Sequence, residues 1–153
     1  MFVEGLLREI GHLILYEQMP EQAEQALRES ATTGTPISAV EQNIFGFDFT
    51  EIGQALVEVW QLPKNFGMAI RYQNNPNGTK DYAFEAALLN MANAMTEGFQ
   101  SPKGYMDWQK LVASESWALT GLNEEGLKEC MVEAGKQLSS MLDLMEETHA
   151  QVA

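Results

Sequence analysis

The sequence has few of the residues from which disulfides, metal sites and nucleic-acid surfaces are built. Its 153 residues include one cysteine, two histidines and nine lysine or arginine residues, against 22 aspartate or glutamate residues. The formal net charge of −13 disfavours a nucleic-acid partner, whose phosphates require a basic surface, and it disfavours an anionic membrane surface as well. The single cysteine excludes an internal disulfide and fits a reducing compartment.

Long hydrophobic runs are also missing. No apolar run approaches the roughly 20 residues that a helix needs to cross a bilayer. Glu4, Arg8 and Glu9 interrupt the apolar N-terminal segment, which has neither the basic start nor the cleavage site of a signal peptide. We therefore expect a cytoplasmic protein without a membrane partner.

Helices account for the hydrophobic pattern that is present. Apolar residues recur at spacings of three and four over most of the chain, and there is no useful alternating strand pattern and no internal repeat. This pattern predicts an all-α protein, a compact bundle of about seven helices in a single domain over residues 1–153. The expected helices cover residues 2–16, 20–33, 35–46, 50–62, 63–72, 81–98 and 123–148, with short segments around Trp108 and Trp117.

Capping signals place the ends of some of these helices. Gly46 is an expected terminator, and Asp48 or Thr50 is expected to cap the helix that follows. Ser38 precedes Glu41 by three residues, which is the spacing of a capping box.

Two side chains on the predicted helices are expected to be inside the protein. Trp60 is predicted to be buried against the first helix rather than exposed as an interface anchor. Cys130 lies in a strongly helical stretch and is predicted to be a small apolar filler rather than a nucleophile.

Five segments stand in an order that matches a known family. They read LLREIGHLIL, GFDFTEIGQALVEVWQLP, AIRYQNNP, LLNMANAM and LTGLNEEGLKECM. From about Gly5 to Met145 the chain resembles the HDOD domain, a relative of the HD metal-dependent phosphohydrolases found in bacterial signal-transduction proteins. The resemblance implies an HD-domain-like helical fold and a regulatory role through protein contacts.

The resemblance also implies that helices which precede the first motif in the family are missing from this sequence. In the family several helices come before the LLxxIG segment, so the chain resembles the C-terminal, HD-derived portion of the domain. Missing helices would leave apolar surface uncovered, and a second copy of the chain or another protein could cover it. We therefore predict a protein partner, with a homodimer as one form of it.

The chain departs from the family at the positions of the metal site. Arg8-Glu9 stands where typical members have histidine-aspartate, and His12 replaces a lysine. In the Asp48-Phe49 pair, Phe49 replaces a histidine. Further along, Gln73 and Asn74 lie where a double histidine precedes the proline, and Asn93 lies where HD enzymes supply an aspartate. The candidate site residues are therefore Arg8, Glu9, His12, Asp48, Phe49, Gln73, Asn74 and Asn93.

These residue types argue against metal chemistry. A guanidinium has no lone pair to give, so Arg8 cannot ligate a metal, and Phe49 and the carboxamides are poor or impossible substitutes for imidazole and carboxylate ligands. Two Glu-x-x-His pairs, Glu9 with His12 and Glu146 with His149, are interpreted as chance. We predict no metal, no cofactor and no catalytic residue.

Three functions remain under consideration. The first is a non-catalytic signalling module that acts through protein contacts. The second is a phosphohydrolase with unusual metal ligands such as Glu9, His12 and Asp48. The third is a module that binds a nucleotide or another small ligand in the cavity lined by Glu9, Gln73, Asn74 and Asn93.

Overall fold

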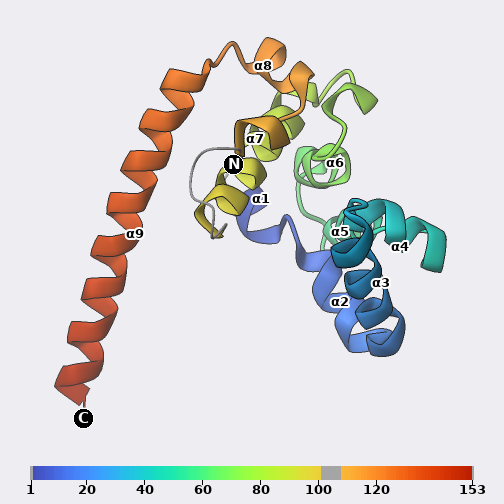
Figure 1. Ribbon diagram of the computed structural model, residues 1–153, viewed down its shortest axis with the longest axis horizontal. Helices are drawn as coiled ribbons and strands as arrows, with labels where there is room; N and C mark the ends of the chain where they lie inside the picture. The colour runs from blue at the N-terminus through green and yellow to red at the C-terminus, as the bar shows by residue number, and fades with distance from the viewer. Residues whose placement is uncertain (1, 101–107, 153) are drawn as a thin grey trace. The chain divides into compact units, whose positions relative to one another are not determined.

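The computed structural model describes residues 2–100 and 108–152 of the chain (Figure 1). Every regular element in these residues is helical, which confirms the predicted all-α class. None of the described helices combines the length and the hydrophobicity that a membrane span requires. The α-helices are α1 (Phe2–Leu7), α2 (Ile10–Gln18), α3 (Pro20–Thr33), α4 (Ile37–Phe45), α5 (Phe49–Val59), α6 (Lys64–Tyr72), α7 (Ala83–Gln100), α8 (Ser114–Thr120) and α9 (Glu124–Val152), and the 3-10 helices are η1 (Pro76–Gly78) and η2 (Trp108–Leu111).

Two compact units divide the chain. Met1–Thr120 forms the first, and Gly121–Ala153, which consists mainly of α9, forms the second. Within the second unit, Asn123 Oδ1 accepts a hydrogen bond from the Gly126 backbone N–H at 2.8 Å, a capping contact at the start of α9. That residues 1–153 make one domain stays a prediction.

The first predicted helix is divided in two. Instead of one helix over residues 2–16, α1 ends at Leu7 and α2 begins at Ile10. Glu9 has φ −112° and ψ 13°, outside the helical range, and its carbonyl accepts from the His12 N–H at 3.0 Å to start α2. Arg8 and Glu9 therefore lie at a junction between two helices rather than within one.

The connection from α4 to α5 confirms two of the capping predictions and corrects a third. Gly46 ends α4 with φ +82°, a left-handed conformation that glycine adopts without strain. Asp48 caps α5 by accepting from the backbone N–H groups of Thr50 and Glu51. The Ser38–Glu41 capping box is wrong, because α4 already begins at Ile37 and the Glu41 carboxylate accepts from the Phe49 N–H instead.

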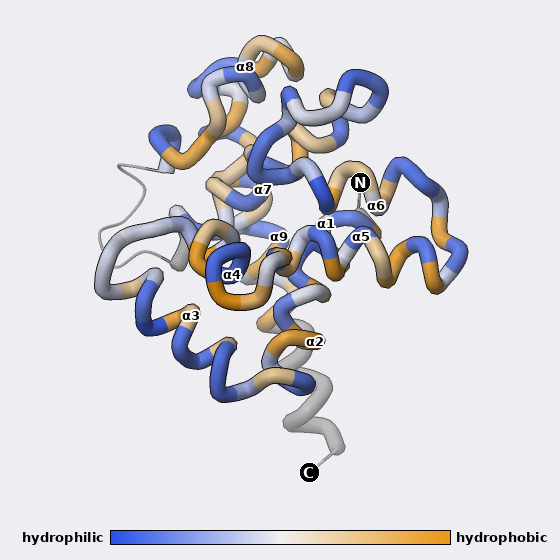
Figure 2. Tube along the Cα trace, turned by 90° about the vertical axis from the view of Figure 1, so that its right-hand side faces the viewer, coloured by the Kyte–Doolittle hydropathy of each residue, from blue (hydrophilic) through white to orange (hydrophobic). Residues whose placement is uncertain are grey.

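The core of the first unit lies between helices that are distant in sequence. Helix α5 packs on α2 and α6, and α6 packs on α7. One apolar cluster contains Val57, Ile70 and Leu89, and a second contains Leu15 and Phe49. Hydrophilic residues run along most of α3 (Figure 2), which covers the second cluster with small buried side chains such as that of Ala23.

Two side chains predicted to be buried are exposed. Trp60 is 49% exposed, because α5 ends at Val59 and Trp60 and Gln61 form the turn that follows, with Gln61 at φ +56°. Cys130 is also exposed, so its predicted role as an apolar filler is wrong.

Candidate functional site

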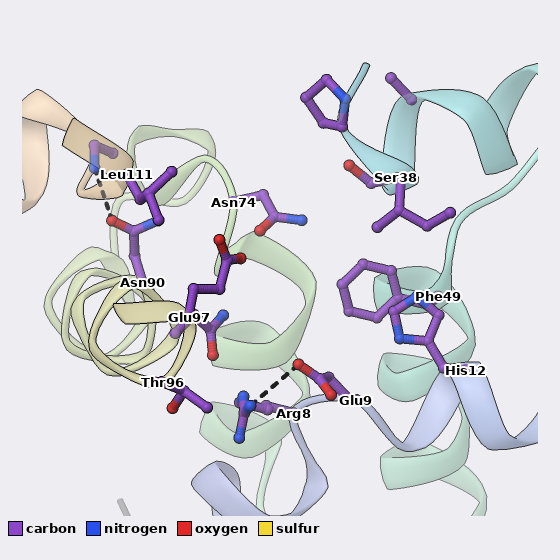
Figure 3. A pocket seen from close by; sticks show the side chains of 15 residues that line it. Arg8, Glu9, His12, Ser38, Phe49, Asn74, Asn90, Thr96, Glu97 and Leu111 are labelled. Carbon is purple, nitrogen blue, oxygen red and sulfur yellow. Dashed lines mark hydrogen bonds and ion pairs between the residues drawn. The ribbon is translucent and has the colours of Figure 1, made fainter. Parts of the chain in front are cut away.

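A pocket of about 550 Å³ lies in the first unit, between the α1–α2 junction, the start of α4, the start of α5 and one face of α7 (Figure 3). We call it the candidate pocket. Its volume lies within the range of small-molecule sites. The residues that line it are Arg8, Glu9, His12, Pro36, Ile37, Ser38, Ala39, Phe49, Asn74, Asn90, Asn93, Thr96, Glu97, Leu111 and Ala113.

The structure brings together most of the residues that the sequence singled out. Those that line the candidate pocket are Arg8, Glu9, His12, Phe49, Asn74 and Asn93. Gln73 does not line it but lies directly behind it, and Asp48 is occupied at the start of α5.

Helix α7 supplies polar lining residues that the sequence reasoning missed. Asn90, Asn93 and Glu97 recur at spacings of three and four, so they share one face of the helix. Only Asn93 was a candidate beforehand. This polar periodicity within an otherwise apolar segment is a signal that could have identified the other two.

Gln73 holds one wall of the candidate pocket in place. Its side chain is fully buried, and its Nε2 donates to the Arg8 carbonyl at 2.9 Å and to the Ile70 carbonyl at 3.0 Å. Its Oε1 accepts from Asn93 Nδ2 at 2.7 Å. One carboxamide therefore joins the α1–α2 junction to α6 and α7, which fixes Arg8 and Asn93 relative to each other.

Two polar atoms in this wall have no hydrogen-bond partner among the described residues. They are Arg8 Nε, a donor, and Asn93 Oδ1, an acceptor, and both are buried. The Arg8 Nη2 atom does have a partner, because it lies 3.1 Å from Glu9 Oε1. An unmatched buried polar atom is unfavourable until water or a ligand supplies its hydrogen bond.

His12 is held by aromatic and acidic neighbours. Its ring stacks on Phe49 with centroids 3.9 Å apart and lies parallel to Tyr16 at 5.7 Å. Its Nε2 lies 3.1 Å from Oε1 of the buried Glu41, close enough for an ion pair but not aligned as a hydrogen bond. The other Glu41 oxygen accepts from the Phe49 N–H at 3.0 Å, so Glu41 bridges α2 and α5 from α4.

The pKa of Tyr16 is raised by its surroundings, which include two of these carboxylates. Partial burial of its side chain raises the pKa of the Tyr16 hydroxyl above the ordinary 10.0, and the nearby carboxylates of Glu41 and Glu9 raise it further. The neutral phenol is therefore favoured in the folded protein.

Asp48 belongs to a separate polar cluster. Its Oδ1 accepts from the Thr50 N–H at 2.9 Å and from the Glu51 N–H at 3.1 Å. Arg71, on α6, donates to Thr50 Oγ1 at 2.9 Å and to Glu51 Oε1 at 2.5 Å. These contacts tie α6 to the start of α5, so Asp48 has a structural role outside the candidate pocket.

The residues of the candidate pocket do not fit an HD-type metal ion. Such a site needs several neutral imidazoles and carboxylates converging on one point. Here Arg8 and Phe49 offer no lone pair, and His12 Nε2 lies 3.1 Å from Oε1 of the buried Glu41. Across the described residues, no group of three or more histidine, cysteine, aspartate or glutamate side chains is placed to hold a metal.

The first half of the chain matches a known family. The HDOD domain family model matches residues 1–76, which contain α1 to α6 and nine of the fifteen residues that line the candidate pocket. Residues 1–76 belong to the HDOD family. This confirms over residues 1–76 the HDOD resemblance that the ordered motifs suggested from about Gly5 to Met145.

A solved structure extends the likeness beyond the HDOD segment. The chain is 25% identical to a protein from Shewanella amazonensis SB2B described as a "Putative phosphohydrolase", with a TM-score of 0.69. The match covers 86% of this chain and 49% of that one, so the chain spans about half of the length of the Shewanella protein. None of the curated proteins compared matches the chain.

Proposed function

We propose that this chain is a non-catalytic regulatory module of HDOD type, whose HD position no longer holds a metal and which acts through contacts with protein. The observation that supports the proposal is the lining of the candidate pocket, which includes the guanidinium of Arg8 and the ring of Phe49. Neither side chain can ligate a metal, and the family resemblance aligns both with ligand positions of an HD site. A bacterial signalling pathway and a cytoplasmic location are part of the proposal, in keeping with the family and with the acidic composition.

The alternative of a phosphohydrolase with unusual ligands finds less support. It would use Glu9, His12 and Asp48 together. Asp48 does not line the candidate pocket, and its Oδ1 already accepts hydrogen bonds from the α5 backbone.

The test is metal content together with hydrolysis. Protein purified without chelator or histidine tag is analysed by mass spectrometry, and phosphodiester hydrolysis is assayed before and after chelation. We expect less than about a tenth of an equivalent of any transition metal and no chelator-sensitive hydrolysis, because the lining residues cannot supply a ligand set. Near-stoichiometric metal with chelator-sensitive turnover would overturn the proposal.

Exposed apolar side chains support the protein-contact part of the proposal. Leu6 on α1 is 67% exposed and Leu13 on α2 is 60% exposed, and Val3 and Tyr16 on the same helices are also exposed. Exposed apolar side chains mark a protein contact where they gather into one patch, and we propose that these four side chains do so. We propose a second copy of the chain as one such partner.

Light scattering tests the homodimer. At high micromolar concentration we expect the mass of a dimer, and the double variant Leu6→Glu/Leu13→Glu should give the monomer mass because it places charge in the contact. Leu27→Glu, which alters an exposed leucine on α3, is the matched control and should leave the dimer intact. A monomeric wild-type protein would remove the homodimer from the proposal.

A further inference from the structure

Helix α9 carries an apolar stripe that repeats every seven residues. Apolar residues follow one another along this helix at alternating spacings of four and three, which is the a/d pattern of a coiled coil. They are Leu127, Met131, Ala134, Leu138, Met141 and Met145, with Leu127 at position d and Met131 at position a. A repeat of 3.5 residues is typical of a helix that coils around a second helix, whereas 3.6 residues is typical of a helix that lies on a globular core.

The stripe is buried at its start and exposed further along the helix. Leu127 and Met131 are buried, but Leu138 is 53% exposed and Met141 is 60% exposed. Leu142, beside Met141 at position e, is 51% exposed. Large apolar side chains gathered on one face of a helix mark a contact surface. The part of the stripe that follows Met131 is therefore available to a partner.

The charges of α9 indicate which partner fits this face. From Leu127 onward, the acidic residues of the helix lie at heptad positions b, c and f, away from the stripe; they are Glu129, Glu133, Asp143, Glu146 and Glu147. The flanking e and g positions, whose charges select partners in coiled coils, contain a single residue with a formal charge, Lys128. Two copies of α9 can therefore pair without opposing carboxylates, although the chain has a net charge of −13, and a basic partner helix would find no acidic flank to bind.

We propose that the stripe of α9 pairs with the same stripe of a second copy of this chain, as a parallel two-stranded coiled coil. The inference rests on the proposed function, which makes a second copy the partner, and it adds a contact to the one proposed at Leu6 and Leu13. In a parallel pair the two first units are joined to the same end of the coil, so their exposed leucines can also meet. Antiparallel helices would place these two connections about 40 Å apart, because α9 has 29 residues.

Both contacts are needed to hold the dimer. Alanine and methionine occupy much of the stripe; alanine buries little apolar area, and methionine packs in many conformations. The coil is therefore weak by itself, and loss of the contact at Leu6 and Leu13 gives the monomer even though α9 is intact.

Disulfide cross-linking tests the pairing of the stripes. Cys130→Ser removes the one native cysteine, and in that background Ala134→Cys places a thiol at position d, whereas the matched control Lys136→Cys places one at the outer position f. Equivalent d positions face each other in a parallel pair, so we expect a mild oxidant to convert most of the Ala134→Cys protein to a covalent dimer on a non-reducing gel. The Lys136→Cys protein should remain largely monomeric on that gel. Equal cross-linking of the two variants, or none of Ala134→Cys, would overturn the inference.

A charge in the stripe provides the second test. Leu138→Glu places two carboxylates opposite each other in the coil and should raise the dissociation constant of the dimer at least about tenfold in light scattering over a dilution series. Val132→Glu makes the same kind of change at another exposed apolar residue of α9, at position b outside the stripe, and should leave the dimer intact. Unchanged dimerisation of the Leu138→Glu protein would refute the pairing.

The failure of this inference can be told apart from the failure of the proposed homodimer. A monomeric wild-type protein overturns both. A dimer that Leu6→Glu/Leu13→Glu dissociates and Leu138→Glu leaves intact overturns the coiled coil alone.

Discussion

Two carboxylates accept hydrogen bonds from backbone N–H groups at the start of α5. One is next to the helix in sequence, and the other comes from the preceding helix. Asp48 is adjacent to the helix, has a side chain 14% exposed, and accepts from the N–H groups of Thr50 and Glu51. Glu41 comes from α4, is 2% exposed, and accepts from the N–H of Phe49 while it faces His12. The local cap can be found from sequence, whereas the buried bridge depends on how α2, α4 and α5 pack.

The two carboxylates are also expected to differ in how much they contribute to the stability of the fold. The cap at Asp48 is partly exposed, so water can replace its hydrogen bonds at modest cost. A fully buried carboxylate that loses its partners, or leaves them unmatched, changes stability more. We therefore expect the contacts around Phe49 to contribute more to stability than the cap at Asp48.

The strongest test of this comparison is Gly11→Ala. A Cβ at Gly11 would lie 2.0 Å from the Phe49 carbonyl oxygen, and because that atom is backbone, α2 and α5 would have to separate. We expect the free energy of unfolding to fall by about 3 kcal/mol or more in urea denaturation. Gly5→Ala, in α1, is the control: nothing lies within 4 Å of its added Cβ, so it should stabilise the protein by about 0.5–1 kcal/mol. Similar effects of the two variants would contradict the close approach of α2 and α5.

Next in size is Glu41→Ala, which removes the bridge itself. It leaves the buried N–H of Phe49 without an acceptor and His12 without its carboxylate, so we expect a loss of about 2–3 kcal/mol in the same measurement. Glu41→Gln keeps an acceptor and should cost less. The exposed Glu29 on α3 offers a control, because Glu29→Ala should stay within about 0.5 kcal/mol of the wild type. A loss at Glu41 no larger than at Glu29 would show that the bridge does not form.

A smaller effect is expected at the local cap. Asp48→Ala should cost about 1 kcal/mol, because α5 loses the acceptor for two of its first N–H groups. Asp48→Asn keeps a capping oxygen and should remain close to the wild type in thermal unfolding. The comparison with Glu41 would be reversed if Asp48→Ala proved the more damaging of the two alanine variants.

The smallest effect concerns pH. Since burial and the carboxylates of Glu41 and Glu9 raise the pKa of Tyr16 in the folded state, the unfolded chain loses this proton first as the pH rises through 10.0. Stability should therefore decrease from about pH 9 to about pH 11, and Tyr16→Phe should reduce that decrease while matching the wild type at about pH 7. Urea unfolding at the three pH values measures it, and identical slopes would count against an acidic environment around Tyr16.

Local signals predicted much of the fold, and non-local contacts explain what they missed. The end of α4 at Gly46 and the cap of α5 at Asp48 depend on residues next to one another, so short motifs were sufficient. The break between α1 and α2 was not predicted, because arginine and glutamate are good helix formers and nothing local stops a helix at Arg8 and Glu9. The exposure of Trp60 also depends on where α5 ends, which the apolar pattern placed too late.

The residues of the candidate pocket also fall into two groups, those that sequence motifs identified and those that depend on contacts between helices. Arg8, Phe49 and Asn93 were identified through family motifs rather than through helical periodicity, and all three line the pocket. Glu97 belongs to no such motif, and Glu41 was interpreted as half of a capping box. Glu97 lines the pocket, and Glu41 contacts two of its lining residues, His12 and Phe49. Neither role follows from sequence, because both depend on contacts between helices.

The hydrogen bond from Gln73 to the Arg8 carbonyl has a consequence for the order of folding. It joins positions 65 residues apart, so the chain entropy lost in closing this loop is recovered only after the intervening helices are in place. Helices α3 to α6 can form and pair through nearer neighbours first. We therefore expect the wall that carries Arg8 and Asn93 to assemble late, with the pocket completed after most of the core that surrounds it.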